Sequence, residues 1–438
     1  MSTRVDAILA EDIANNQVRA SQALSTVPDP STLTGPLDLQ QTLALVALHH
    51  PALASIAYAQ RATEAEVFQA GRLRNPEIEF EVEEFGGSGE NSGFDAAVYT
   101  LRLGQVLELG GDRGARRDRA VSAARLAARD TEATKVAIYT QCTLVFIDLL
   151  EAQKEAVIAR EAKRITQDLV EAARVRVANG AATELELLRA QAHLAQATVE
   201  ARSAERQVSS RRSDLAGMWG AQGAAFSEAI GPFDDIAGAV PLDAVLAAVD
   251  GTPAVARWAD EMTERLAAIQ MERAARVPDL AVMAGVEHAS ADDETTFLMG
   301  LGIELPVFDR NSGAIQAASY RAMQAERDRD TARLETRSAV VGLWHAWMAA
   351  RERAMSLAEQ VLPSLEAAKA AADTAFRSGK IDYLDVLSIQ EDYLAGRIAI
   401  TTARAEAHRA QAALEGLLAR PLTSLNWGPD QVPVEEQP

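Results

Sequence analysis

Few side chains in this sequence have the types and spacing that chemistry requires. None of the six histidines stands at metal-ligand spacing from another ligand residue. They are His49, His50, His193, His288, His345 and His408. The acidic run Asp292-Asp293-Glu294 could hold a divalent cation, although a solvated loop explains it more simply. No nucleophile, base and acid form a catalytic set, so the sequence predicts no enzyme, no bound metal and no cofactor.

Two other candidates also favour structural roles. Cys142 is the single cysteine, which excludes an internal disulfide and a cysteine-rich metal site. Its helical spacing from Ile138, Val145 and Leu149 predicts a small buried residue. The glycine-rich turn at Gly110 lacks both the G-x-G-x-x-G pattern and the lysine–serine ending of a P-loop, so no nucleotide-type phosphate loop is predicted.

A duplicated motif carries the remaining acidic candidates. Gly180-x-x-Thr183-x-Leu185-Glu186-Leu187-Leu188-x-x-Gln191 returns as Gly379-x-x-Asp382-x-Leu384-Asp385-Val386-Leu387-x-x-Gln390. The offset is 379 − 180 = 199 residues, and Pro51-Ala52-Leu53 also returns as Pro253-Ala254-Val255. The chain therefore contains two copies of one unit, and its fold should be pseudo-symmetric.

Each copy predicts a short helix, a β-hairpin and two long helices. In the first hairpin, at 76–107, Ile78, Phe80 and Val82 alternate with glutamates, which gives one apolar and one acidic face. The second hairpin, at 278–305, repeats the pattern more weakly. Strands of this length fit a tilted crossing of a bilayer, but a half-buried soluble sheet gives the same alternation.

The helical segments are unusually long. From Ala115 to Asn179 there is no glycine or proline, and a continuous helix of that length would span roughly 95 Å. After Gly180 the return helix is expected over Ala181–Ala216. The second copy predicts helices over Ala314–Ser378, with a bend at Gly342 or Pro363, and over Lys380–Arg420. Such lengths indicate a coiled coil or a helical barrel.

The order of elements divides the chain into five parts. They are an N-terminal extension (1–36), a first repeat (37–216), a linker rich in glycine and proline (217–241), a second repeat (242–421) and a C-terminal tail (422–438). No stretch is expected to be apolar enough for a transmembrane helix. The first thirty residues lack the apolar core of a signal peptide. The net charge of −20 argues against a nucleic-acid partner.

These features resemble the TolC-like outer-membrane efflux proteins. The resemblance covers about Leu37–Pro421, and its best marks are the turns within Arg176–Gln191 and Arg377–Gln390. The strand-to-helix turn Leu107-Glu108-Leu109-Gly110-Gly111-Asp112-Arg113-Gly114-Ala115 is similar to that of the heavy-metal branch, typified by the CzcC and CusC proteins.

The resemblance implies a mixed α/β membrane protein. Its long antiparallel helices would form a trimeric α-helical barrel, continued by a transmembrane β-barrel with four strands per protomer. Such a homotrimer is the passive exit duct of a tripartite efflux system. Its partners would be outer-membrane lipid, a periplasmic membrane-fusion adaptor and an inner-membrane RND-type pump, and its cargo would be heavy-metal cations.

The resemblance also assigns roles to the helix tips. It implies a pore gate at Glu186, Asp382 and Asp385, where threefold symmetry would make rings of carboxylates. A solvated helix face or a helix cap is the other interpretation, with Thr183 and Asp382 as capping residues. Ser388 stands where relatives may carry a second acid. The adaptor-contact tips are Asn179, Gly180, Ala181, Ser378, Gly379 and Lys380.

Two alternatives stay open. The duct could serve multidrug or organic-solute export, or type I secretion, because it conducts what its pump delivers. A soluble coiled-coil scaffold would explain the missing signal peptide and the missing lipid-anchoring cysteine near the start. An upstream start codon, or numbering from the mature end, would explain both equally. The alternating strands favour the outer-membrane duct over the scaffold.

Overall fold

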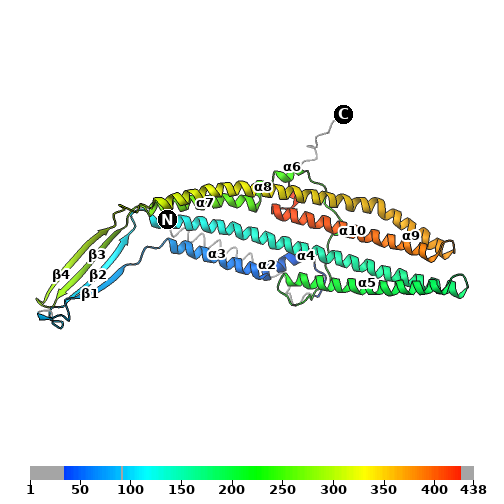
Figure 1. Cartoon of the computed structure of the whole chain (residues 1–438), viewed down its shortest axis with the longest axis horizontal. Helices are drawn as coiled ribbons and strands as arrows, with labels where there is room; N and C mark the ends of the chain where they lie inside the picture. Colours follow the sequence, from blue (N-terminus) through cyan, green and yellow to red (C-terminus); the bar gives the residue numbers. More distant parts are fainter. Residues whose placement is uncertain (1–33, 90–91, 426–438) are drawn as a thin grey trace, which may run out of the picture. The chain divides into compact units, whose positions relative to one another are not determined.

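The computed structural model of the chain describes residues 34–89 and 92–425 (Figure 1). The expectations for the signal peptide, for most of the N-terminal extension and for most of the C-terminal tail therefore lie outside the described residues. The described residues form two compact units, each built from both halves of the chain. The hairpin unit, named for its two pairs of long antiparallel helices, contains 34–55, 133–252 and 336–425. The sheet unit contains 56–89, 92–132 and 253–335.

The sheet unit is named for its four-stranded antiparallel sheet, in the order β1-β2-β3-β4. The strands are β1 (Glu77–Glu83), β2 (Val98–Leu107), β3 (Leu280–Ala289) and β4 (Glu294–Ile303). The two hairpins, which are far apart in sequence, are joined by the pairing of β2 with β3. The strands occupy the segments in which the side chains alternate.

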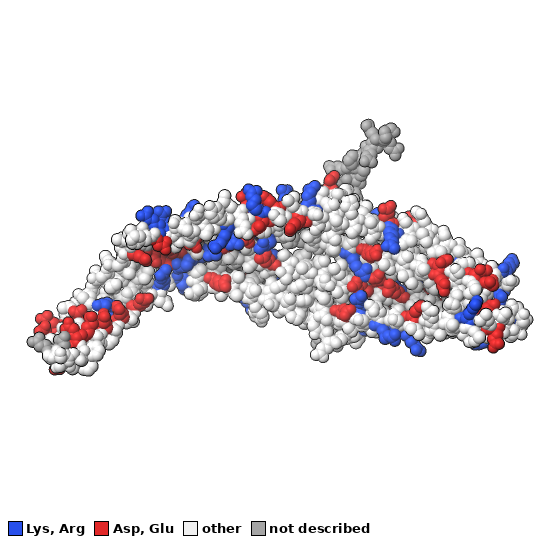
Figure 2. Space-filling view, viewed as in Figure 1, with Lys and Arg blue, Asp and Glu red and all other residues white. Residues whose placement is uncertain are grey.

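The register makes one face of this sheet apolar across all four strands. Phe80 pairs with Leu101, Leu101 with Val286, and Val286 with Phe297. This face is largely open, since Phe80 is 63% and Phe297 is 87% exposed. On the other face Arg102 binds the carboxylates of β1, and Figure 2 shows acidic side chains gathered over the sheet. The sheet of a soluble protein usually packs its apolar face against other elements, whereas the described residues leave this face largely exposed.

Four helices contribute to the sheet unit. They are α3 (Pro51–Ala70), α7 (Pro253–Ala274) and the first parts of α4 (Asp112–Ala178) and α8 (Ser312–Ser356). Ion pairs join α7 to α4, among them Arg119–Glu264 at 3.0 Å and Arg129–Asp260 at 3.0 Å. At the strand-to-helix turn, a Cβ on Gly110 would lie 2.5 Å from the carbonyl oxygen of Ala274. The close approach of the two chain segments explains the glycine there.

The hairpin unit contains the remaining parts of α4 and α8. Its other helices are α2 (Leu39–His49), α5 (Glu184–Gly217), α6 (Leu242–Leu246), η2 (Val249–Gly251), η3 (Leu357–Val361), α9 (Leu362–Arg377), α10 (Tyr383–Leu418) and η4 (Leu422–Ser424). The fold is thus mostly helical with one small antiparallel sheet.

The irregularity in the second long helix lies at Pro363 and not at Gly342. Helix α8 runs through Gly342 without interruption, whereas the π-helical segment η3 directly precedes α9. Proline lacks an N–H and its ring clashes with the carbonyl of the preceding turn, so the regular α-helical ladder cannot continue there. Helix α4 is unbroken over Asp112–Ala178, and it has no glycine or proline after Gly114, as the sequence predicts.

One expectation about membrane helices is wrong. Helix α4 contains a window long and apolar enough to cross a membrane by length and composition, with 28% of that window buried. A core helix of a soluble protein passes the same test, so this window by itself identifies no membrane span.

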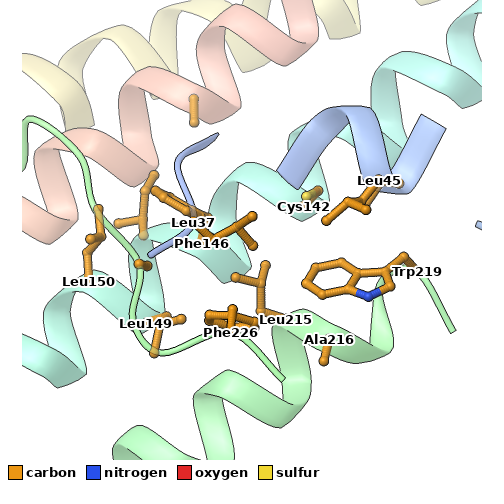
Figure 3. Close-up of a cluster of buried hydrophobic side chains, with 14 of the residues drawn as sticks. Leu37, Leu45, Cys142, Phe146, Leu149, Leu150, Leu215, Ala216, Trp219 and Phe226 are labelled. Carbon is orange, nitrogen blue, oxygen red and sulfur yellow. The ribbon is translucent and has the colours of Figure 1, made fainter. Parts of the chain in front are cut away.

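An apolar core lies in the hairpin unit where α4 and α5 meet residues 37–46 (Figure 3). Cys142 of α4 is fully buried beside Leu45, and Phe146 packs near Leu37. Cys142 is therefore the small buried residue that its spacing predicts.

Residues 218–241 contain no helix or strand, yet they pack into this core. Phe226 and Phe233 are buried. The side-chain amide of Gln153 holds Ala229 by two hydrogen bonds, donating to its carbonyl at 2.8 Å and accepting from its N–H at 2.8 Å. Leu37 forms a parallel β-bridge with Ala229. The connection between the two copies is therefore a fixed part of the hairpin unit.

Candidate functional site

The turn between α4 and α5 ends a helix in a specific way. Gly180 adopts a positive φ of 69°, which favours glycine. Its N–H donates to the carbonyl of Val177 at 3.0 Å, and the N–H of Ala181 donates to that of Arg176 at 2.8 Å. These two bonds form a Schellman motif, which satisfies carbonyls that the helix end would leave open.

The turn between α9 and α10 has the same geometry. Gly379 has a φ of 75°, and its N–H donates to Phe376 at 3.0 Å. The N–H of Lys380 donates to Ala375 at 2.9 Å. Both turns lie side by side at one end of the hairpin unit (Figure 1). The repeated motif therefore encodes a repeated turn.

Each return helix begins with a side-chain cap. Thr183 accepts a hydrogen bond from the N–H of Glu186 at 3.4 Å, and Asp382 accepts one from that of Asp385 at 2.9 Å. The carboxylate of Asp382 thus caps α10, as the helix-cap interpretation of this position predicts.

The two equivalent acids lie in different environments. Glu186 forms an ion pair with Arg176 at 3.5 Å, and the side chains are only 16% and 22% exposed, respectively. Asp385 is exposed and forms no ion pair with any residue in 34–89 or 92–425. The position that matches Arg176 in the second copy is Ala375, so the cation is missing there.

Aromatic side chains join the first helical hairpin (α4–α5) to the second (α9–α10) below the turns. The guanidinium carbon of Arg176 lies 5.0 Å from the ring centroid of Phe376. The ring of Tyr383, which is 2% exposed, lies 6.3 Å from that of His193 on α5. Burial, reinforced by the negative charges of Glu391 and Glu186, raises the pKa of Tyr383 to about 12. The phenol is therefore neutral at physiological pH.

A continuous apolar cluster supports this arrangement. It draws residues from all four helices of the two hairpins, namely Ile165, Leu169, Val170, Ala173, Ala190, Ala372, Phe376, Tyr383, Val386 and Leu387. Beside it, Gln390 donates to Asp373 at 2.8 Å, and Lys369 pairs with Asp373 at 3.1 Å. These polar contacts lie within the second hairpin, whereas the apolar cluster and the contact of Arg176 with Phe376 hold the two tips together within one protomer.

The outermost residues of the tips are solvent-exposed. They are Asn179, Gly180, Ala181, Ser378, Gly379 and Lys380. Exposed backbone and small side chains at two adjacent turns offer a surface to another protein, whereas the carboxylates can attract cations. Among the described residues, no three His, Cys, Asp or Glu side chains come together to hold a metal ion.

Reasoning from the sequence missed Arg176, Phe376 and Tyr383 as the residues that join the tips. A direct comparison of the two copies at the offset of 199 residues contains the signal. At this offset Arg176 aligns with Ala375, and Tyr383 aligns with Glu184. At these two positions, the side chain present in only one copy, Arg176 or Tyr383, contacts the other hairpin.

The chain matches the family described as outer membrane efflux protein over residues 42–221 and 247–420. It is similar to the cobalt-zinc-cadmium resistance protein CzcC of Cupriavidus metallidurans, with 28% identity over 391 residues, covering 89% of this chain and 92% of CzcC. It is also 28% identical to the nickel-cobalt-cadmium resistance protein NccC of Alcaligenes xylosoxydans xylosoxydans, over 69% of this chain and 67% of NccC.

Solved structures share the fold. The structure of CusC superposes with a TM-score of 0.73 at 15% identity, covering 90% of this chain and 96% of CusC. The outer membrane protein VceC of Vibrio cholerae superposes with a TM-score of 0.71 at 19% identity, covering 88% of this chain and 96% of VceC.

Proposed function

We propose that this protein, which belongs to the outer membrane efflux protein family, is the passive outer-membrane exit duct of a tripartite system that exports heavy-metal cations. The single observation that carries the duct is the exposed apolar face that runs in register across β1 to β4. In water such an exposed apolar face would promote aggregation, whereas the outer face of a transmembrane β-barrel is apolar because it contacts lipid.

The open edges of the sheet support a homotrimer. In the strand order β1-β2-β3-β4, the outer edges of β1 and β4 have no partner among the described strands. Unpaired backbone groups are costly in lipid, and bilayer barrels begin at about eight strands, so one chain cannot close a barrel. Three copies would join β1 of one protomer to β4 of the next, with the helices continuing as a tunnel in the periplasm.

The tips are the proposed gate and docking surface. Asp385 is the stronger gate candidate because its carboxylate is exposed and unpaired among the described residues. Glu186 contributes less to a carboxylate ring while Arg176 neutralises it, and Asp382 serves mainly as a cap. The exposed turns at Gly180 and Gly379 are proposed to contact the periplasmic adaptor, which links the duct to an inner-membrane RND-type pump.

The likeness to CzcC supports the cargo. It extends over 89% of this chain, and the name of CzcC states resistance to cobalt, zinc and cadmium. The duct performs no chemistry of its own; the inner-membrane partner supplies the energy.

A deletion strain tests this proposal. Loss of the gene should sensitise cells to cobalt, zinc or cadmium salts and leave sensitivity to dyes and antibiotics unchanged. Sensitivity to dyes and antibiotics alone would replace the metal cargo with organic solutes. Fractionation with chemical cross-linking should recover a trimer in the outer membrane, and a monomeric soluble protein would overturn the duct.

A further inference from the structure

A groove rich in arginine lies in the sheet unit, where α3 leads into β1 and where α4 begins. It has a volume of about 1090 Å³. Its lining includes the side chains of Arg72, Arg74, Arg113 and Arg116, together with Gln105 of β2. Figure 2 shows basic side chains gathered where the strands of this unit meet its helices. In a chain with a net charge of −20, such a concentration of cations calls for an explanation.

Internal ion pairs account for only part of this positive charge. Glu108, whose side chain is 5% exposed, pairs with Arg116 at 2.5 Å and with Arg74 at 3.4 Å. Hydrogen bonding to Arg116 holds the pKa of Glu108 below its usual range, so this carboxylate stays charged. Arg74 also pairs with Asp279 at 3.6 Å. These acids fix two of the guanidinium groups in place.

The other two arginines keep their charge free. Among residues 34–89 and 92–425, no acidic side chain forms an ion pair with Arg72 or Arg113. Arg72 stacks on the ring of Phe68, with 3.6 Å between its guanidinium carbon and the ring centroid. Stacking uses the face of the guanidinium and leaves its N–H edge available to an acceptor.

The strand register places this groove at the foot of the apolar face of the sheet. Side chains alternate along β2, so Gln105 is on the same face as Leu101 and Leu103. The side-chain amide of Gln105 donates to the carbonyl of Arg74 at 3.0 Å, which ties the groove to that face. Leu73, 67% exposed, adds apolar surface beside the arginines. Cationic and apolar surfaces thus meet along one line.

We propose that this groove binds the phosphate of an anionic glycerophospholipid whose acyl chains lie against the apolar face of the sheet. Arginine fits a phosphate diester because its planar fork donates two hydrogen bonds at once. An acyl chain would follow the exposed side chains above Gln105 toward Leu103 and Leu101. A free inorganic phosphate would satisfy the arginines but would leave the adjoining apolar surface uncovered.

The proposal rests on the proposed placement of the sheet in a bilayer. It adds a specific anchor at the periplasmic rim. Basic residues at a membrane surface contribute about 1 kcal/mol each toward anionic lipid. Removal of Arg72 and Arg113 together should therefore weaken binding by about thirtyfold, by the relation of free energy to affinity.

Native mass spectrometry of the full chain in detergent tests the groove. The probes are dioleoyl phosphatidylglycerol, dioleoyl glycerol with the same acyl chains and no phosphate, and inorganic phosphate. The variant R72Q/R113Q removes the two unpaired cations and leaves the Glu108 ion pairs intact. The control R125Q/R321Q removes two exposed arginines of the sheet unit that do not line the groove.

The native chain and the control should retain phosphatidylglycerol, R72Q/R113Q should lose it, and dioleoyl glycerol should bind to none of them. Equal binding of dioleoyl glycerol, equal retention by R72Q/R113Q, or displacement by millimolar inorganic phosphate would each overturn the proposal. Conductance of the native chain in planar bilayers separates this result from the duct. Conductance without selective lipid binding would contradict only the proposed lipid site. Lipid binding without conductance would contradict the proposed channel function.

Discussion

Arg176 lies over the ring of Phe376, with 5.0 Å between its guanidinium carbon and the ring centroid, and so ties the first helical hairpin to the second. The same guanidinium pairs with Glu186 at 3.5 Å. One side chain therefore links both turns of the tip and also neutralises one of its two equivalent acids. Any separation of the hairpins must break the contact with Phe376, whereas the pair with Glu186 lies within the first hairpin.

Replacement of Arg176 by glutamine should favour an open tip. The cation–π contact with Phe376 joins the two hairpins and is partly buried, so its loss should shift the equilibrium by about 1–2 kcal/mol. Single-channel recordings in planar bilayers should show a larger or longer-lived open state. R174Q is the matched control because Arg174 forms an exposed pair with Glu171 on the same helix, which contributes little. If the two variants show the same open state, Arg176 does not hold the tip closed.

The ring of Tyr383, and not its hydroxyl, should stabilise the hairpin unit. The hydroxyl is buried and has no hydrogen-bond partner among the described residues, so Tyr383→Phe should cost nothing or stabilise slightly. Tyr383→Ala would leave a cavity in the apolar cluster and should lower the free energy of unfolding by about 3–5 kcal/mol. Denaturant titrations of the purified variants give both values. A large loss in the phenylalanine variant would mean that the hydroxyl is bonded.

Cys142 should be inert to thiol reagents while the hairpin unit is folded. It is fully buried, and burial raises the pKa of its thiol to about 12. Its contribution to stability should therefore be complete below about pH 8.5, the pKa of an unfolded thiol, and should decline as the pH rises toward 12.

Because the chain has one cysteine, labelling with a thiol reagent at pH 8 reports directly on this core. The native protein should remain unlabelled, and the denaturant-unfolded chain should bind one equivalent. Labelling of the native protein at the rate of a free thiol would show that the core opens readily.

The sequence was sufficient to predict the elements that follow from local periodicity. The glutamates of β1 alternate with apolar residues, and α4 has no glycine or proline after Gly114, so each segment specifies its own structure. The pairing of β2 with β3 could not be derived in the same way. It joins residues such as Leu101 and Val286, which are far apart in the chain, and their association depends on tertiary packing.

The two turns at the tips were predicted in position, but their contacts were not. The repeated motif located Gly180 and Gly379, because a left-handed turn requires a specific residue. The motif also places Glu186 and Asp385 at equivalent positions in the two copies. The structure gives the two acids different environments through Arg176, a residue outside the shared pattern. Symmetry in a sequence predicts equivalent backbones, whereas the partners of each side chain depend on where the copies differ.

The difference between the two acids gives a sharp test of the gate. Asp385 is exposed, without an ion pair to any described residue, so Asp385→Asn should reduce the preference of the pore for cations over anions. Glu186→Gln should change it less, because Arg176 already neutralises Glu186. Reversal potentials in a salt gradient measure the preference of each variant. In an Arg176→Gln background Glu186 would be released, and Glu186→Gln should then have an effect close to that of Asp385→Asn. If Asp385→Asn leaves the reversal potential unchanged, the carboxylate does not line the conducting path and the gate must lie elsewhere.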